Sequence, residues 1–261
     1  MLNIIKVDLF RFAKSKVWLK IFLGLSIYLL IGNVYSVLNG GHGSITIVSD
    51  LKTQNEVSFY ANGSEMMLQL LRGSNLLFFC LLPLVLNIFV SDFKWGTLKN
   101  ELSFRYSRRQ FYLAKFILTS LLAVVLPIFY VLYGLGLNQL FHGFSGTFQI
   151  HDFLLVIQIV LLQAPIYIGL IGMLLLLGII CQSNTLLVGI ALAYQMAIFF
   201  LFGILGNGFF ANFEPLTCLN SAAFFQYITL NEKLTIVLVG FVMMVVSAVL
   251  GNIILYKKAI Q

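Results

Sequence analysis

Charged residues are scarce in this 261-residue sequence, because Asp, Glu, Lys and Arg together make up only 10% of it. A soluble domain usually carries about 25% of such residues, which form its hydrated surface. Hydrophobic residues make up 60% of the chain, and its mean hydropathy is +0.99. The composition therefore excludes a water-soluble fold and predicts an all-α polytopic membrane protein, with a single transmembrane domain over residues 1–261.

Cysteine is scarce as well, with only Cys80, Cys181 and Cys218 present. Cys80 lies within an apolar run and Cys181 at the end of another. Cys218 lies in a segment that we expect on the outer side of the membrane. Cysteines on opposite sides of a membrane cannot be bridged, so we expect no disulfide framework. We interpret all three as small hydrophobic residues.

Signatures of catalysis are missing too. The sequence contains no Gly-x-x-x-x-Gly-Lys-Ser/Thr phosphate-binding loop, so the chain is not expected to hydrolyse ATP by itself. Residues 143–146 resemble the Gly-x-Ser-Gly motif of rhomboid-type intramembrane proteases, but a nucleophilic Ser145 needs a neighbouring base, and no histidine follows His151. We therefore predict a turn there, and a chain that is not an enzyme and binds no cofactor or metal of its own.

The formal net charge of +7 raises the question of a nucleic-acid partner. Binding to nucleic acid needs a basic face on a folded surface, and this composition leaves no soluble face to carry one. Basic residues also collect at the cytoplasmic ends of membrane helices, beside anionic lipid. We therefore expect a lipid bilayer as the partner and no nucleic acid.

Long uncharged runs dominate the rest of the sequence. About 20 apolar residues are enough to cross the roughly 30 Å hydrocarbon layer of a bilayer. Six runs qualify, and they cover residues 17–38, 69–91, 116–137, 153–180, 185–205 and 234–256. The sequence therefore predicts six transmembrane helices.

The basic residues are sorted along the chain. Thirteen of the 16 lie before residue 21, between residues 94 and 115, or at Lys257 and Lys258. With six spans, all 13 fall on one side of the membrane, which the positive-inside rule identifies as the cytoplasm. We expect a multi-pass protein of the cell membrane with both termini in the cytoplasm.

Two segments outside the spans have a mixed character. Residues 1–16 carry Leu2, Ile5, Leu9 and Phe12 at three- and four-residue intervals, which predicts an amphipathic interfacial helix on the inner leaflet. Residues 206–232 are too polar to span and too apolar for a free loop. They are interpreted as short re-entrant helices before the sixth span, or equally as an ordered, partly buried outer loop.

The segment that follows the second span has the most informative pattern. Gly96 allows a sharp chain reversal, and Thr97 is a suitable N-cap for a helix. Leu98 and Leu102 then share one face of that helix. A short amphipathic helix across the cytoplasmic face suits a groove on a partner protein, although a basic loop anchored to lipid headgroups is the alternative interpretation.

This segment resembles the coupling segment of ABC-2-type permeases, the membrane subunits of one class of ABC transporters. The matching positions are Asp92, Gly96, Thr97, Leu98, Lys99, Ser107, Arg108 and Lys115. The six-span layout, the amphipathic leader and the segment before the last span are similar to that family as well. The chain departs from it in having no large outer domain, and in carrying Asp92 where Glu is more usual.

The resemblance implies the transmembrane permease subunit of an ATP-driven exporter. Its partners would be a separate ABC ATPase subunit, which binds ATP and Mg²⁺, and a second permease copy or a sister permease. The cargo would be an amphipathic or hydrophobic peptide toxin, antimicrobial peptide or drug. The residues implied in coupling to the ATPase are Asp92, Gly96, Thr97, Leu98, Lys99, Leu102, Arg105, Ser107 and Arg108.

Polar and small residues within the spans are the remaining candidates. Amide side chains there either join helices by hydrogen bonds or line a substrate path. The five candidates are Asn33, Asn87, Gln158, Gln163 and Gln195. Small residues share one face of the last span (Gly240, Ser247, Gly251) and of the fifth (Gly189, Ala193). They favour close helix packing within the chain, with a dimer interface as the alternative.

A function from another class also fits these features. A membrane immunity or sensory protein that binds a peptide without transporting it would have the same composition and topology. Such a protein would need no ATPase partner, whereas the absence of ionisable residues deep in the spans argues for an outside energy source if the chain transports anything.

Overall fold

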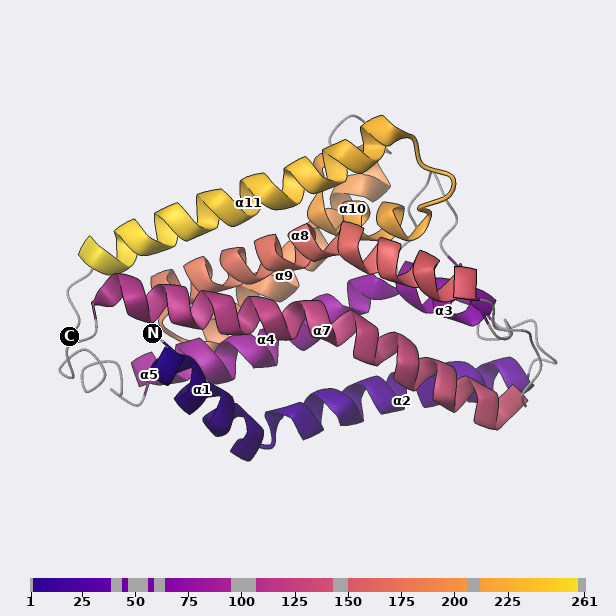
Figure 1. The fold of residues 1–261 in the computed structure, drawn as a ribbon, viewed down its shortest axis with the longest axis horizontal. Helices are drawn as coiled ribbons and strands as arrows, with labels where there is room; N and C mark the ends of the chain where they lie inside the picture. Colours follow the sequence, from indigo (N-terminus) through magenta and orange to yellow (C-terminus); the bar gives the residue numbers. More distant parts are fainter. Residues whose placement is uncertain are drawn as a thin grey trace.

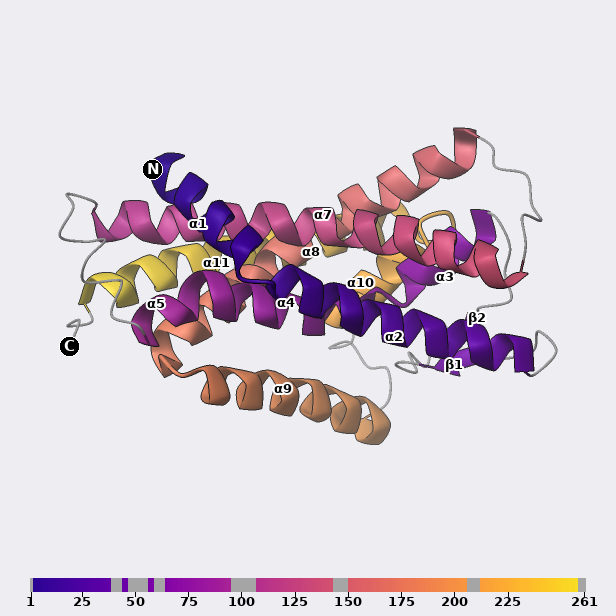
Figure 2. The same cartoon turned by 90° about the horizontal axis from the view of Figure 1, so that it is seen from below.

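The computed structural model describes residues 2–38, 44–46, 56–58, 64–94, 107–142, 150–205 and 212–257. These residues are almost entirely helical, and the long helices lie side by side in one elongated bundle (Figures 1 and 2). The short strands β1 (Ser44–Thr46) and β2 (Glu56–Ser58) pair antiparallel, with Ile45 opposite Val57. The expected all-α architecture is thus confirmed for the described residues, apart from this small ribbon.

Five helical segments within the described part of the chain are long and apolar enough to cross a membrane. They are α2 (Val17–Leu38), the composite segment Ser74–Phe93, α7 (Arg108–His142), α8 (Ile150–Cys181) and α11 (Leu230–Lys257). The remaining predicted span, 185–205, coincides with α9 (Asn184–Leu205), a helix of 22 residues.

The second span is divided into several pieces where the sequence predicts one continuous helix over 69–91. They are α3 (Ser64–Arg72), the 3-10 turn η1 (Ser74–Leu76), α4 (Leu77–Val85), the π-helical turn η2 (Leu86–Val90) and α5 (Ser91–Lys94). Pro83 lies within α4. Because proline has no N–H group to donate, it weakens the helix around it.

Small residues allow α8 and α11 to pack closely. A Cβ atom on Gly240 would lie 2.5 Å from the carbonyl carbon of Pro165, and one on Gly169 would lie 2.8 Å from the Cβ of Met243. Further along α11, Ser247 packs directly against Gly172. The small face predicted on the last span therefore packs within the chain, as its first interpretation proposed.

The first helix, α1 (Leu2–Lys14), differs from the simple amphipathic prediction. Ile4 and Asp8 are buried against the bundle, whereas Leu9, expected on the apolar face, is 47% exposed. The face turned toward the protein thus carries a carboxylate. This single acidic residue changes the interpretation of the helix, because a buried charge needs partners.

A tight corner joins α1 to α2. The Ser15 hydroxyl donates to the Phe12 carbonyl oxygen at 2.8 Å, and Lys16 adopts a left-handed backbone conformation with φ of 56°. The Trp18 indole N–H donates to the Ala13 carbonyl oxygen at 3.0 Å. These bonds fix the corner between α1 and α2.

One short helix, α10 (Pro215–Ala223), precedes the last span in the described part of 206–232. The Glu214 carboxylate accepts the Thr217 backbone N–H at 2.6 Å and so caps the helix, and Pro215 occupies the first turn. Leu216 and Leu219 are buried, so α10 belongs to the packed interior.

Candidate functional site

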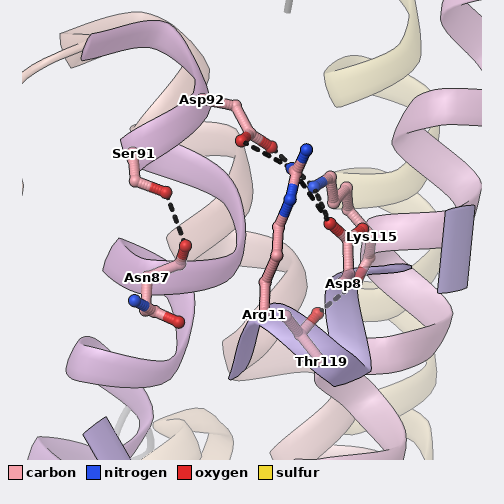
Figure 3. A network of polar contacts seen from close by, with 7 residues as sticks. All are labelled: Asp8, Arg11, Asn87, Ser91, Asp92, Lys115 and Thr119. Atoms are coloured by element: carbon pink, nitrogen blue, oxygen red, sulfur yellow. Dashed lines mark hydrogen bonds and ion pairs between the residues drawn. The ribbon is translucent and has the colours of Figure 1, made fainter. Parts of the chain in front are cut away.

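Three elements meet near Lys94 and Ser107, the described residues before and after the segment 95–106. They are α1, α5 and the beginning of α7, and the C-terminal end of α11 lies at the same end of the molecule (Figure 1). Four charged side chains from these three elements form one ionic cluster: Asp8, Arg11, Asp92 and Lys115 (Figure 3).

Lys115 is the centre of this ionic cluster. Its Nζ atom lies 2.7 Å from Oδ1 of Asp8 and 2.5 Å from Oδ2 of Asp92, and its side chain is completely buried. Both carboxylates are nearly buried as well, with side-chain exposures of 3% and 7%. One ammonium group thus joins α1 to α5 across α7.

Arg11 closes the ionic cluster on its outer side. Its Nη1 atom lies 3.7 Å from Oδ1 of Asp8 and 3.6 Å from Oδ1 of Asp92. The Arg11 side chain is 46% exposed, so this cation faces the surroundings. Two cations and two carboxylates make the group formally neutral, which is the condition under which buried charges are tolerated.

The first turns of α7 hold Lys115 in place. The Thr119 hydroxyl donates to the Lys115 carbonyl oxygen at 2.7 Å, and the Phe111 ring lies 5.1 Å from the ammonium group. Phe111 is itself fully buried. The cation therefore enters a low-dielectric site in which its two carboxylate contacts are strengthened.

The position of Asp92 depends on the π-helical turn η2 just before it. A π turn holds one more residue than an α turn, so the same residues in α geometry would rotate everything that follows by about 100°. The Ser91 hydroxyl donates to the Asn87 carbonyl oxygen at 2.5 Å within this region. Conversion of η2 to α geometry would thus turn Asp92 away from Lys115.

The beginning of α7 is fixed by a reciprocal cap. The Gln110 backbone N–H donates to Ser107 Oγ at 3.2 Å, and the Ser107 backbone N–H donates to Gln110 Oε1 at 3.3 Å. This is a capping box, which fixes the first residue of a helix. Arg108 Nη1 in turn donates to the carbonyl oxygens of Leu255 and Tyr256 at 3.2 and 2.9 Å, and so ties α7 to the end of α11.

Only part of the predicted coupling set falls within the described residues. The structure brings Asp92 into the ionic cluster, Ser107 into the capping box and Arg108 onto α11. The other six positions lie outside the described residues: Gly96, Thr97, Leu98, Lys99, Leu102 and Arg105.

Asp8 and Arg11 are functional candidates that the sequence analysis did not single out. A signal was present, because Asp8 is the only acidic residue before Asp50 and lies one turn after the apolar Ile4. An isolated carboxylate on the apolar side of a membrane-surface helix needs a buried cation. The identity of that cation was not visible, because Lys115 is 107 residues away in the chain.

Two of the five amides proposed for a substrate path join helices instead. The Asn138 side-chain amide donates to Asn33 Oδ1 at 3.1 Å and links α7 to α2. Gln163 Nε2 donates to Ser74 Oγ at 3.2 Å and to the Leu219 carbonyl oxygen at 2.9 Å. Gln163 thereby holds the 3-10 turn and α10 against α8, the more common role of buried amides.

The other three amides are dispersed over the molecule. Gln158 is exposed on α8, Gln195 is half-buried on α9, and the half-buried Asn87 side chain points away from the ionic cluster (Figure 3). The structure therefore brings Asn33 and Gln163 into separate hydrogen-bonded contacts and does not gather the five amides in one place.

A cavity of about 540 Å³ lies among α8, α9, α10 and α11. Its wall includes Met173, Tyr194, Phe213, Pro215, Leu238 and Met243. Beside it, the Tyr194 hydroxyl donates to Glu214 Oε1 at 2.8 Å. Burial raises the pKa of the Glu214 carboxyl above its usual range, although hydrogen bonds from Thr217, Leu216 and Tyr194 oppose the shift. A largely apolar wall with one polar corner is typical of small-molecule sites.

Metal ligands are not grouped in the part of the chain described here. Among those residues, no three His, Cys, Asp or Glu side chains lie close enough together to hold a metal ion.

No protein-family model, curated protein or solved structure matches this chain.

Proposed function

We propose that the chain is the transmembrane permease subunit of an ATP-driven exporter of the ABC-2 type. In this proposal α9 serves as the fifth of six spans, α10 dips into the outer leaflet, and both termini lie in the cytoplasm. The chain works with a separate ABC ATPase, which supplies ATP and Mg²⁺, and with a second copy of itself or a sister permease.

The observation that carries the proposal is the ion pair between Asp92 and Lys115. These residues flank the segment 95–106, and Lys115 also contacts Asp8 of α1. A partner that moved this segment would act on α5, α7 and α1 together, because a single buried ammonium group connects them. The π-helical turn η2 lies just before Asp92 in the chain. A change of this turn to α geometry would rotate Asp92 relative to the rest of the second span.

The distribution of charge supports the orientation. The beginning of α7 with Arg108 and Arg109, the basic helix α1 and the end of α11 with Lys257 all lie at one end of the bundle (Figure 1). Under the positive-inside rule that end faces the cytoplasm, where an ATPase would bind.

The cargo proposal rests on the cavity among α8, α9, α10 and α11. Its volume of about 540 Å³ and its wall of Met, Phe, Leu and Val side chains suit part of an amphipathic or hydrophobic molecule. A peptide toxin, an antimicrobial peptide or a hydrophobic drug would have this chemistry, and Glu214 beside the cavity would favour a cargo with a hydrogen-bond donor.

The test is a Leu98→Asp substitution in the proposed coupling helix. A charge on its apolar face should abolish co-purification of an ABC ATPase from native membranes and cargo-stimulated ATP hydrolysis, while membrane insertion stays normal. Leu140→Asp is the matched control, because Leu140 is 77% exposed near the far end of α7.

Each outcome of this test decides between functions. Export that survives Leu98→Asp removes the coupling role of segment 96–102. A wild-type chain that binds peptide but retains no ATPase and moves no cargo would instead identify the membrane immunity or sensory protein.

A further inference from the structure

A second cavity opens between α2 and α4. Its volume is about 260 Å³, and it is lined on one side by Lys20, Gly24 and Leu25 and on the other by Phe79, Cys80 and Pro83. We infer that this groove is a binding site for one anionic phospholipid of the inner leaflet. The inference does not depend on the proposed transport function.

The shape of the groove depends on Gly24. No atom lies within 4 Å of the place where its Cβ would be, so the missing side chain leaves an open channel in the surface of α2. Across the channel, Leu76, Phe79, Cys80 and Pro83 follow each other at helical spacing and form the opposite wall. The wall covers seven residue steps, or about 10 Å of helix.

The groove opens toward the lipid. Leu23 and Ile27, which flank Gly24 on α2, are 54% and 50% exposed, as expected of side chains that contact acyl chains. Its volume is below the range of about 300–1,000 Å³ that is typical of drug-sized ligands. A narrow apolar channel along a helix suits a single acyl chain.

Lys20 supplies the charge that selects the headgroup. It is the only charged residue of α2 and lies at the end of the groove nearest to α1. Among the described residues, no carboxylate forms an ion pair with it. A lysine at such a position extends its ammonium group toward the lipid phosphates.

The depth of Lys20 is set by Trp18. This indole is 49% exposed and lies two residues away, and tryptophan side chains favour the membrane–water interface. Lys20, a cation at headgroup level that lines the apolar channel, matches a phospholipid with a net negative charge.

The experiment measures lipid retained by the purified full-length chain with native mass spectrometry. The chain is titrated with phosphatidylglycerol or phosphatidylcholine of identical acyl chains. We expect one tightly held phosphatidylglycerol and a preference over phosphatidylcholine of roughly fivefold, the effect of one interfacial lysine. Lys20→Gln should reduce this preference to about onefold, and Gly24→Leu should remove the held lipid altogether.

Gly136→Leu is the matched control, since Gly136 on α7 also has no atom within 4 Å of a Cβ position and does not line the groove. It should retain the lipid as the wild type does. Equal retention of the two lipids by the wild type, or undiminished retention by Gly24→Leu, would overturn the inference.

A second readout keeps the inference falsifiable if Gly24→Leu fails to fold. The chain has two tryptophans, so Trp95→Phe leaves Trp18 as the only indole. Brominated phosphatidylglycerol in vesicles should quench Trp18 more strongly than brominated phosphatidylcholine at the same low mole fraction, and Lys20→Gln should abolish the difference. Equal quenching by both lipids, with Lys20 present, contradicts an anionic site.

Discussion

At the scale of single residues, Lys115 determines how α1, α5 and α7 are held together at one end of the bundle. A buried ammonium group is costly unless carboxylates and hydrogen bonds compensate for its lost hydration. Asp8 and Asp92 provide that compensation from two different elements. The value of the arrangement therefore lies less in net stability than in the fact that none of the three groups can be left alone.

Replacement of Lys115 by Met should destabilise the chain by about 3–5 kcal/mol, because two nearly buried carboxylates would lose their common cation. The thermal unfolding midpoint in detergent measures this effect. Lys257→Met, at an exposed position of α11, is the control and should leave the midpoint unchanged. The double variant Lys115→Met with Asp8→Asn should recover part of the loss, and full additivity of the two changes would argue against direct coupling.

The raised pKa of the Glu214 carboxyl predicts that the stability of the folded chain depends on pH. Burial raises the pKa of its carboxyl in the folded chain above the ordinary value of 4.5, so the folded state binds the proton more tightly than the unfolded state. The stability from this group is fully present below pH 4.5 and is lost as the pH rises through the raised pKa. Thermal unfolding across this window should show the decline, and Glu214→Gln should flatten it. An unchanged slope in that variant would assign the decline to other groups.

At the scale of elements, close packing between helices depends on which glycines face a neighbouring helix. The α8–α11 contact brings the backbone of Pro165 against Gly240, whereas the region around Gly189 on α9 is open. Both glycines belong to small-residue faces that look equivalent in the sequence. Only the structure separates a face used within the chain from one that remains available.

Gly240→Ala should therefore destabilise the chain by about 1–3 kcal/mol, since the new methyl group would lie 2.5 Å from the Pro165 carbonyl carbon and backbone cannot move aside as a flexible side chain can. Gly189→Ala is the matched control and should be neutral or slightly stabilising, because its Cβ meets nothing and alanine favours helix. Thermal unfolding of both variants provides the comparison. Equal losses would mean that α9 packs more tightly than the structure shows.

The sequence predicted the elements best where one physical factor dominates. Apolar length located α2, α8 and α11 closely, because burial in hydrocarbon sets both ends of a span. It underestimated α7, predicted over 116–137, because the capping box at Ser107 extends the helix into its polar flank. It also missed the breaks of the second span, where a 3-10 turn and a π turn interrupt the α-helix.

The ionic cluster was predictable only in part. Resemblance to a coupling motif singled out Asp92 and Lys115, and the structure places them in contact. Asp8 and Arg11 could not be predicted as members of the cluster, because α1 meets α7 only in the folded chain. A contact between residues about 100 positions apart leaves no trace in periodicity or composition.

At the scale of the whole molecule, the exposed surface is that of a protein solvated by lipid. Large apolar side chains such as Leu161 on α8 and Leu238 on α11 are 66% and 61% exposed along the sides of the bundle. In water such a surface would aggregate. Most of the cationic residues lie instead toward one end, with Arg72 and Lys233 near the other, so the molecule has a lipid-facing belt and a predominantly basic end.

This asymmetry makes the orientation testable. In a variant with Cys80, Cys181 and Cys218 replaced by Ser, we add a single cysteine either at the exposed Ser107, beside the ionic cluster, or at Tyr227, which is 80% exposed in the turn before α11. A membrane-impermeant maleimide should label Ser107→Cys from the cytoplasmic side of sealed vesicles and Tyr227→Cys from the opposite side, because the basic residues beside Ser107 are retained in the cytoplasm. Labelling after detergent permeabilisation controls for reactivity at both sites. Protection of Ser107→Cys from the cytoplasmic side, with labelling from outside, would place the segment 95–106 beyond the reach of any cytosolic ATPase and would end the coupling proposal.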